Sequence, residues 1–123
     1  MEPNRTVRVG ARLAAVAWMA VIFGLSSLPG SSVPGKYGTL AHFVVYAVLG
    51  ALLVLALPRS DRPWAAVATA VAIASLYGIT DEFHQSFVPG RVPDVADWAV
   101  DTAGALTAAI LLESARRIVA GRQ

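Results

Sequence analysis

Residues 40–57 read LAHFVVYAVLGALLVLAL, and no Asp, Glu, Lys or Arg interrupts them. A helix that crosses the hydrocarbon core of a bilayer needs roughly 17–25 mostly apolar residues. This stretch has that length, and Pro58 follows it directly as a residue that ends helices. Residues 40–57 therefore predict a membrane-spanning helix.

Three further apolar runs, at residues 13–28, 64–80 and 98–112, have similar lengths. Hydrophobic residues make up 56% of the 123-residue chain and charged residues only 15%, with a mean hydropathy of +0.60. Soluble domains average about 25% charged residues, so too little polar material remains here to cover a water-soluble domain. We predict an all-α integral membrane four-helix bundle that forms one domain over residues 1–123.

Basic residues flank the four runs unequally. Lys36 and Arg91 are the two on one side of the predicted membrane. The eight on the other side are Arg5, Arg8, Arg12, Arg59, Arg62, Arg116, Arg117 and Arg122. Cytoplasmic loops carry the excess of Lys and Arg, so both termini are expected in the cytoplasm. The bias toward Ala, Val and Arg is typical of a GC-rich bacterial genome. Together with the four apolar runs, this bias predicts a multi-pass protein of the bacterial cell membrane.

Two partner classes follow from the same pattern. The basic residues lie at the edges of apolar runs, so the lipid bilayer is the expected partner and nucleic acid is not.

The arginines before residues 13–28 also resemble the start of a signal peptide. Residues 26–29 (SSLP) offer no convincing small-x-small cleavage site, so we expect this run to be retained; cleavage would leave the remaining topology unchanged.

Most of the other polar residues fall on the side opposite the termini. His42 and Tyr46 are four residues apart near the start of residues 40–57, which places them on one helix face. Residues 81–91 read DEFHQSFVPGR and follow the third run. Asp94, Asp97 and Asp101 are spaced as one helical stripe, which Gly104 and Ala108 continue. Ionisable groups at membrane depth face a protein interior or a wet cavity, so we expect a polar pocket at the extracytoplasmic side.

The charge balance of this pocket indicates a cation. Its carboxylates are Asp81, Glu82, Asp94, Asp97 and Asp101, against the basic Lys36 and Arg91. Such an acidic excess disfavours a metal-free phosphate site and favours either a bound divalent cation or carboxylates kept protonated by burial and mutual repulsion. Carboxylate ligands suit Mg²⁺, Ca²⁺ or Mn²⁺, and the histidines would also allow zinc or iron. The spacing matches no specific metal signature.

The same residues resemble a known family. The matching positions are Ser26-Ser27-x-Pro29, His42-Phe43-x-x-Tyr46, Asp81-Glu82-x-His84-Gln85-x-Phe87-x-Pro89-Gly90-Arg91, Asp97 and Gly104. In this combination the chain resembles the VanZ-like family of small bacterial membrane proteins. It departs from the family pattern at Thr39, where a lysine is usual, and at Asp101, where asparagine is frequent. The resemblance implies a several-span membrane protein, and the founding member is associated with resistance to the glycopeptide teicoplanin; it implies no particular reaction.

We assign candidate roles on this basis. The candidate catalytic residues are Asp81, Glu82, His84 and Arg91, with His84 or Glu82 moving a proton and Arg91 holding an anionic oxygen. The candidate substrate-binding residues are His42, Tyr46, Gln85, Asp97 and Asp101. The candidate metal ligands are Asp81, Asp97 and Asp101. Simpler alternatives stay open: Asp94 capping a helix, Arg91 pairing with Glu82 or Asp94, and His42 and Tyr46 bridging helices.

Three functions fit these features. The first is a cell-envelope protein that acts on a lipid-linked or cell-surface substrate, with a role in glycopeptide resistance. The second is a non-catalytic binding or transport-associated protein that recognises an envelope component or an ion. The third is a structural assembly partner, whose pocket variants would fail by loss of folding or of partner binding and would have no specific ligand.

The predicted orientation can be tested directly because the chain contains no cysteine. We expect Val92→Cys to react with a membrane-impermeant maleimide in intact cells, and Arg122→Cys to react only after the membrane is permeabilised. The opposite labelling pattern would mean that the termini lie outside.

Overall fold

The computed structural model describes residues 5–29, 35–59, 61–62 and 64–122, without the side chains of 35–37. In these ranges it contains four helices: α1 (Arg5–Ser26), α2 (Gly35–Ala56), α3 (Ala65–Gln85) and α4 (Val95–Gly121). Each helix is long and apolar enough to cross a membrane. The prediction of an all-helical protein with four membrane-spanning helices is confirmed in these terms.

The helices differ in length from the apolar runs that predicted them. Helix α3 continues past Thr80 to Gln85, so Asp81, Glu82 and His84 lie on a helix and not in a loop. It continues because Gly78, Asp81 and Gln85 form a buried face on which the polar side chains find partners. Helix α4 begins at Val95, ahead of the apolar run 98–112 and in agreement with the helical stripe that starts at Asp94. Asp94 caps it by accepting a hydrogen bond from the backbone N–H of Ala96 at 2.9 Å.

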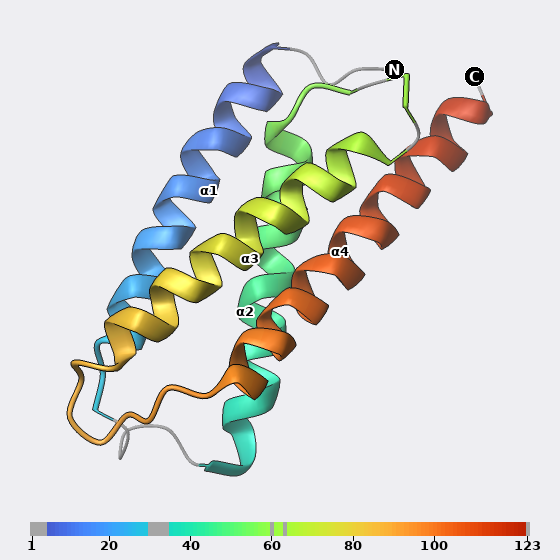
Figure 1. Cartoon of the computed structure of the whole chain (residues 1–123). Helices are drawn as coiled ribbons and strands as arrows, with labels where there is room; N and C mark the ends of the chain where they lie inside the picture. Colours follow the sequence, from blue (N-terminus) through green and yellow to red (C-terminus); the bar gives the residue numbers. More distant parts are fainter. Residues whose placement is uncertain (1–4, 30–34, 60, 63, 123) are drawn as a thin grey trace.

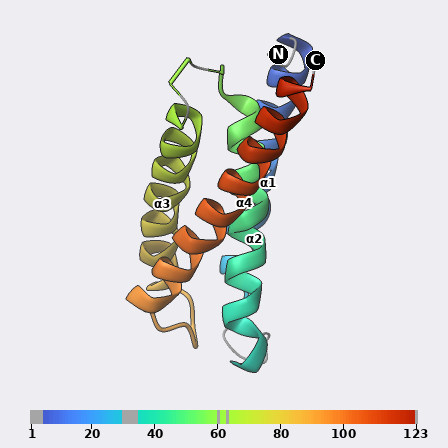
Figure 2. The ribbon, with the colours of Figure 1, turned by 90° about the vertical axis from the view of Figure 1, so that its right-hand side faces the viewer.

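The chain runs up and down, so that α1 starts and α4 finishes at the same end of the bundle (Figure 1). Helix α1 finishes, α2 starts and the α3–α4 connection lies at the opposite end. Helix α2 lies against α1 and α4, and α4 also packs on α3, whereas α1 and α3 touch much less (Figure 2). The start of α1 and the end of α4 thus share one end of the bundle, and the cytoplasmic placement of the termini remains a prediction.

Small residues bring α2 and α4 into close contact. A Cβ atom on Gly104 would clash with the backbone carbonyl of Phe43, and one on Gly50 would clash with the backbone of Ala105. Gly104 of α4 and Gly50 of α2 thus lie at the helix–helix contact, with Ala105 beside Gly50. Such residues let two backbones approach closely in a membrane, where packing replaces the hydrophobic effect as the force between helices.

The apolar side chains divide between a thin core and an exposed outer surface. The buried core contains Leu49, Val54, Ala70, Ala74, Ala105 and Ala109. In contrast, Leu13, Leu76 and Leu111 are 68%, 64% and 65% exposed. Monomeric soluble proteins rarely expose large contiguous apolar patches, so this surface fits a lipid environment.

The end that carries the termini holds a charged cluster that the sequence did not suggest. Glu113 is buried, and its carboxylate lies 2.9 Å from Arg117, 3.6 Å from Arg116 and 4.0 Å from Arg59. Arg12 donates a 3.0 Å hydrogen bond to the backbone carbonyl of Ala56. The arginines that indicated topology therefore also hold a buried carboxylate and satisfy a carbonyl at the end of α2.

The close approach of α2 and α4 predicts opposite results for one substitution at two glycines. Gly104→Ala should lower the free energy of unfolding by about 1–3 kcal/mol because a backbone must move. Gly10→Ala, where a Cβ meets nothing within 4 Å, should raise it by roughly 0.5–1 kcal/mol through better helix propensity. Reversible unfolding in mixed detergent micelles measures both, and equal effects would contradict the close contact.

Candidate functional site

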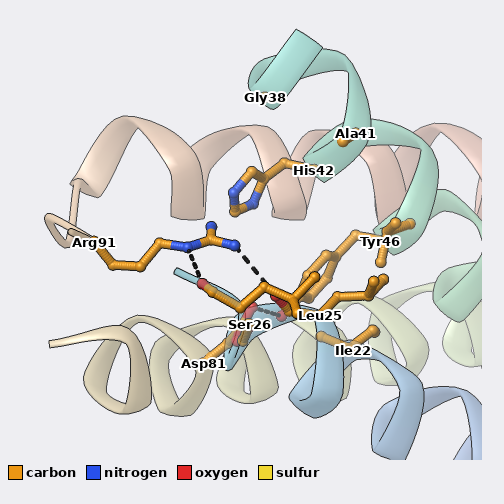
Figure 3. Close-up of a pocket in the computed structure, with 11 residues that line it drawn as sticks. Ile22, Leu25, Ser26, Gly38, Ala41, His42, Tyr46, Asp81 and Arg91 are labelled. Atoms are coloured by element: carbon orange, nitrogen blue, oxygen red, sulfur yellow. Dashed lines mark hydrogen bonds between the residues drawn. The ribbon is translucent and has the colours of Figure 1, made fainter. Parts of the chain in front are cut away.

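The predicted site residues lie at the end of the bundle opposite the termini, which we call the polar end; it contains Ser26, His42, Asp81, Arg91 and Asp101. A pocket of about 140 Å³ opens there between α1, α2 and α3, with Arg91 reaching over it from the α3–α4 connection (Figure 3). Its lining residues are Ile22, Leu25, Ser26, Leu28, Gly38, Ala41, His42, Val45, Tyr46, Asp81 and Arg91.

Asp81 ties three helices together behind this pocket. Its Oδ1 accepts a hydrogen bond from the Ser26 hydroxyl of α1, and its Oδ2 accepts one from the Tyr46 hydroxyl of α2 at 3.0 Å. The Gln85 amide donates to the Ser26 Oγ at 3.3 Å and extends the network. Asp81 is 6% exposed. Because both carboxylate oxygens are already hydrogen-bonded, Asp81 holds the pocket wall in place.

His42 and Asp101 form the second polar contact of this end. The His42 Nδ1 lies 2.7 Å from the Asp101 Oδ1, and the Nε2 on the other side of the ring lies 3.9 Å from the Asp97 Oδ2. Asp101 is completely buried, and its Oδ2 has no hydrogen-bond partner among the described residues. A Cβ on Gly78 would come within 3.5 Å of this oxygen. An imidazole oriented by a buried carboxylate is an arrangement used for proton transfer and for metal binding.

Glu82 approaches the same pair from α3. Its Oε2 accepts a hydrogen bond from the backbone N–H of Asp94 at 2.9 Å, whereas its Oε1 is buried without a partner in the described part of the chain. His42, Glu82 and Asp101 each offer one ligand atom, and these atoms lie within 4.8 Å of one another. The described residues thus group Asp101 with His42 and Glu82, and not with Asp81 and Asp97 as the sequence suggested.

Arg91 is held by backbone carbonyls. Its Nε donates to the Leu28 carbonyl, just after α1, at 2.9 Å, and its Nη2 donates to the Leu25 carbonyl, in the last turn of α1, at 3.2 Å. Gly90, directly before it, has a φ of 76°, a conformation that favours glycine. No carboxylate of the described residues lies within ion-pair distance of Arg91, so the suggested pairing with Glu82 or Asp94 is not observed.

His84 lies away from the pocket. Its ring stacks on Phe23 of α1 with 4.1 Å between centroids, and its Nε2 is 3.4 Å from the Ser27 Oγ. Asp81 lines the pocket and Asp101 contacts it through His42, but His84 does not belong to its lining. The side chain of Lys36 falls outside the described residues.

Sequence reasoning gave no site role to Ser26, Gly78 or the carbonyls of Leu25 and Leu28. Ser26 could have been noticed as a polar residue at the end of an apolar run that matches the family pattern. The carbonyls carry no sequence signal, because any residue at the end of a helix leaves such acceptors.

A family model described as VanZ/LLP1 matches residues 11–116, which is most of the chain. No curated protein and no solved structure matches the sequence. The resemblance suggested by the sequence motifs is confirmed by the family match.

The Asp81 network predicts unequal effects for two tyrosine substitutions. Tyr46→Phe removes a donor from a buried carboxylate and should lower the free energy of unfolding by about 1–3 kcal/mol. Tyr77→Phe removes a 2.6 Å bond to the Met19 carbonyl and should cost about 0.5–1.5 kcal/mol. Unfolding in mixed micelles compares the two, and a larger loss for Tyr77→Phe would contradict the role assigned to Asp81.

Proposed function

The chain belongs to the VanZ/LLP1 family, and we propose that it acts at the bacterial cell envelope on the anionic head group of a lipid-linked molecule. The polar end would face the outside of the cell membrane in this proposal. The head group would enter the pocket between α1 and α2, where such a molecule reaches the edge of the bilayer.

The observation that carries the proposal is the position of Arg91. Its guanidinium lies at the pocket and is held by the carbonyls of Leu28 and Leu25. These neutral acceptors fix the side chain without cancelling its positive charge. An arginine presents a planar set of N–H donors that matches carboxylate and phosphate oxygens. We therefore assign Arg91 to the anionic oxygen of the substrate.

The walls of the pocket favour an amphiphilic ligand. Ile22, Leu25 and Val45 line it with apolar groups, while His42, Asp81 and Arg91 provide polar ones (Figure 3). A lipid-linked molecule presents the same combination of an acyl or prenyl chain and a charged head. This match supports a membrane-borne substrate over a wholly water-soluble one.

The size of the pocket limits what can enter it. Sites for whole drug-sized ligands measure about 300–1,000 Å³, whereas this pocket measures about 140 Å³. A head group fits this volume and a glycopeptide antibiotic does not. A role in teicoplanin resistance would therefore act through the envelope substrate and not through capture of the antibiotic in the pocket.

We divide the remaining polar residues by their contacts. Asp81, Tyr46 and Gln85 position the pocket wall, because their polar groups bond to one another and to Ser26. His42, Asp101 and Glu82 form the group of side chains that would carry out a reaction on the head group. Asp97 lies beside the His42 ring. The proton-transfer role suggested for His84 is left out because its ring stacks on Phe23 and its Nε2 lies near the Ser27 Oγ, outside both the pocket lining and the His42 cluster.

Native mass spectrometry of the protein extracted from its own membrane tests the proposal. We expect the wild type to retain an anionic lipid-linked molecule. Arg91→Gln should reduce the bound fraction about tenfold, since charge-assisted hydrogen bonds contribute about 1.5–3 kcal/mol. Arg91→Lys should give an intermediate loss, because it keeps the charge without the planar donor set.

Arg122→Gln is the matched control, because Arg122 lies just past α4 at the opposite end of the bundle. It should leave the bound fraction unchanged. Equal retention by wild type and Arg91→Gln, or no retained anionic lipid in the wild type, would overturn the proposal.

A further inference from the structure

We propose that His42, Glu82 and Asp101 bind one divalent transition-metal cation, of the Zn²⁺ or Mn²⁺ class, at the polar end. The inference deepens the proposed function, because a cation here would add positive charge behind the pocket that receives the anionic head group. Its binding does not depend on that function, so the two can be tested separately.

Three helices bring the ligand atoms together. His42 comes from α2, Glu82 from α3 and Asp101 from α4, and their ligand atoms lie within 4.8 Å of one another. Imidazole nitrogens and carboxylate oxygens lie about 2.0–2.2 Å from a bound Zn²⁺, so ligand atoms on opposite sides of an ion are about 4 Å apart. The 4.8 Å limit admits this spacing, and the His42 Nδ1 and the Asp101 Oδ1, which are 2.7 Å apart, would move apart to bind the ion.

Unpartnered buried oxygens give an independent reason for a cation. Asp101 is fully buried, and its Oδ2 has no partner among the described residues. The buried Oε1 of Glu82 also has none there. A buried charged oxygen without a partner is strongly destabilising. A cation bound by these two side chains would supply the positive charge that the buried carboxylates lack.

No basic side chain supplies that charge in the described part of the chain. Between described side chains, the ion pairs of Asp101 and Asp97 involve only His42, and none joins Glu82 to Lys or Arg. The nearby Arg91 is directed at the carbonyls of Leu28 and Leu25. Three carboxylates therefore surround one imidazole, an excess of negative charge that a divalent cation would balance.

The orientation of the His42 ring indicates that Asp101 is a metal ligand and that Asp97 positions the ring. The Nδ1 faces Asp101 at 2.7 Å, and the Nε2 faces Asp97 at 3.9 Å. A cation bound at Nδ1 would replace the proton shared with Asp101 and release it to solvent. The Nε2 would then carry the remaining ring proton and point it at Asp97. Histidine ligands are oriented in this way by a carboxylate on the other ring nitrogen, which makes Asp97 a positioning residue.

The donor set selects the class of metal. One imidazole with two carboxylates suits Zn²⁺, Mn²⁺ or Fe²⁺ better than Mg²⁺ or Ca²⁺, which prefer oxygen ligands alone. The chain has no cysteine to favour a softer ion. We therefore take Zn²⁺ and Mn²⁺ as the probes and Mg²⁺ as the comparison ion.

Calorimetric titration of the full chain in detergent, stripped of metal with a chelator, tests the inference. We expect one Zn²⁺ or Mn²⁺ per chain, and Mg²⁺ to bind more weakly. Asp97→Asn should weaken binding about 10–100-fold, as for other residues that orient a metal ligand. Asp101→Asn and Glu82→Gln should each weaken it further. His42→Gln should also shift the visible absorption bands of a Co²⁺-loaded sample, because the ion loses its nitrogen ligand.

Asp61→Asn is the matched control, because Asp61 is exposed and lies between α2 and α3, at the end of the bundle opposite the cluster. It should keep the wild-type metal affinity, and loss of binding in this variant would overturn the proposed ligand set. If Asp101→Asn fails to fold, Glu82→Gln decides the question, because its amide oxygen can still accept the Asp94 N–H bond.

Absence of stoichiometric binding, or equal affinity in wild type, Glu82→Gln and His42→Gln, would overturn the inference. Arg91→Gln should leave metal affinity unchanged while it weakens retention of the lipid. A protein that retains the lipid but binds no metal would therefore refute the metal site and leave the proposed function standing.

Discussion

A carboxylate buried among apolar helices must find hydrogen-bond donors or a cation, since its charge is costly away from water. Within the described residues, Asp81, Asp101 and Glu113 are all buried. Asp81 is held by Ser26 and Tyr46, Asp101 by His42, and Glu113 by arginines. At the polar end, the contacts of Asp81 join α1, α2 and α3, and the contact of Asp101 joins α2 and α4. At the opposite end, Glu113 joins α4 to Arg59, which follows α2. The helices therefore cannot rotate about their axes without separating a charge from its partner.

Packing between α2 and α4 makes these polar contacts possible. Gly50 and Gly104 allow the two backbones to touch, which places His42 and Asp101 within hydrogen-bond distance at the polar end. Helix α1 lies on the other side of α2 and brings Ser26 to Asp81. The pocket lies between these two sets of contacts, with His42 and Tyr46 of α2 lining it one turn apart. Its polar lining thus results from the same contacts that hold the bundle together.

Much of this architecture could be predicted from residue order. Four apolar runs predicted four helices, and the spacing of His42 and Tyr46 placed them on one face, where both now line the pocket. The length of α3 was missed, because a run that stops being apolar need not stop being helical when its polar residues find partners in a neighbouring helix. The surroundings of His84 and Arg91 were missed for a related reason. Their partners are Phe23 and the carbonyls of Leu25 and Leu28, which lie about 60 positions away in the chain and carry no distinctive pattern.

Hydropathy, charge and helical spacing are properties of neighbouring residues. They were sufficient to predict four helices long and apolar enough to span a membrane, with many polar residues near one end, and the motifs were sufficient to indicate the VanZ/LLP1 family. Which carboxylate meets which donor depends on how far each helix is rotated and how closely it approaches the next. That choice is made by steric contacts such as Gly104 against Phe43, between residues far apart in the chain. Only the tertiary structure could therefore place Asp81 with Ser26 and Tyr46, and Asp101 with His42 and Glu82.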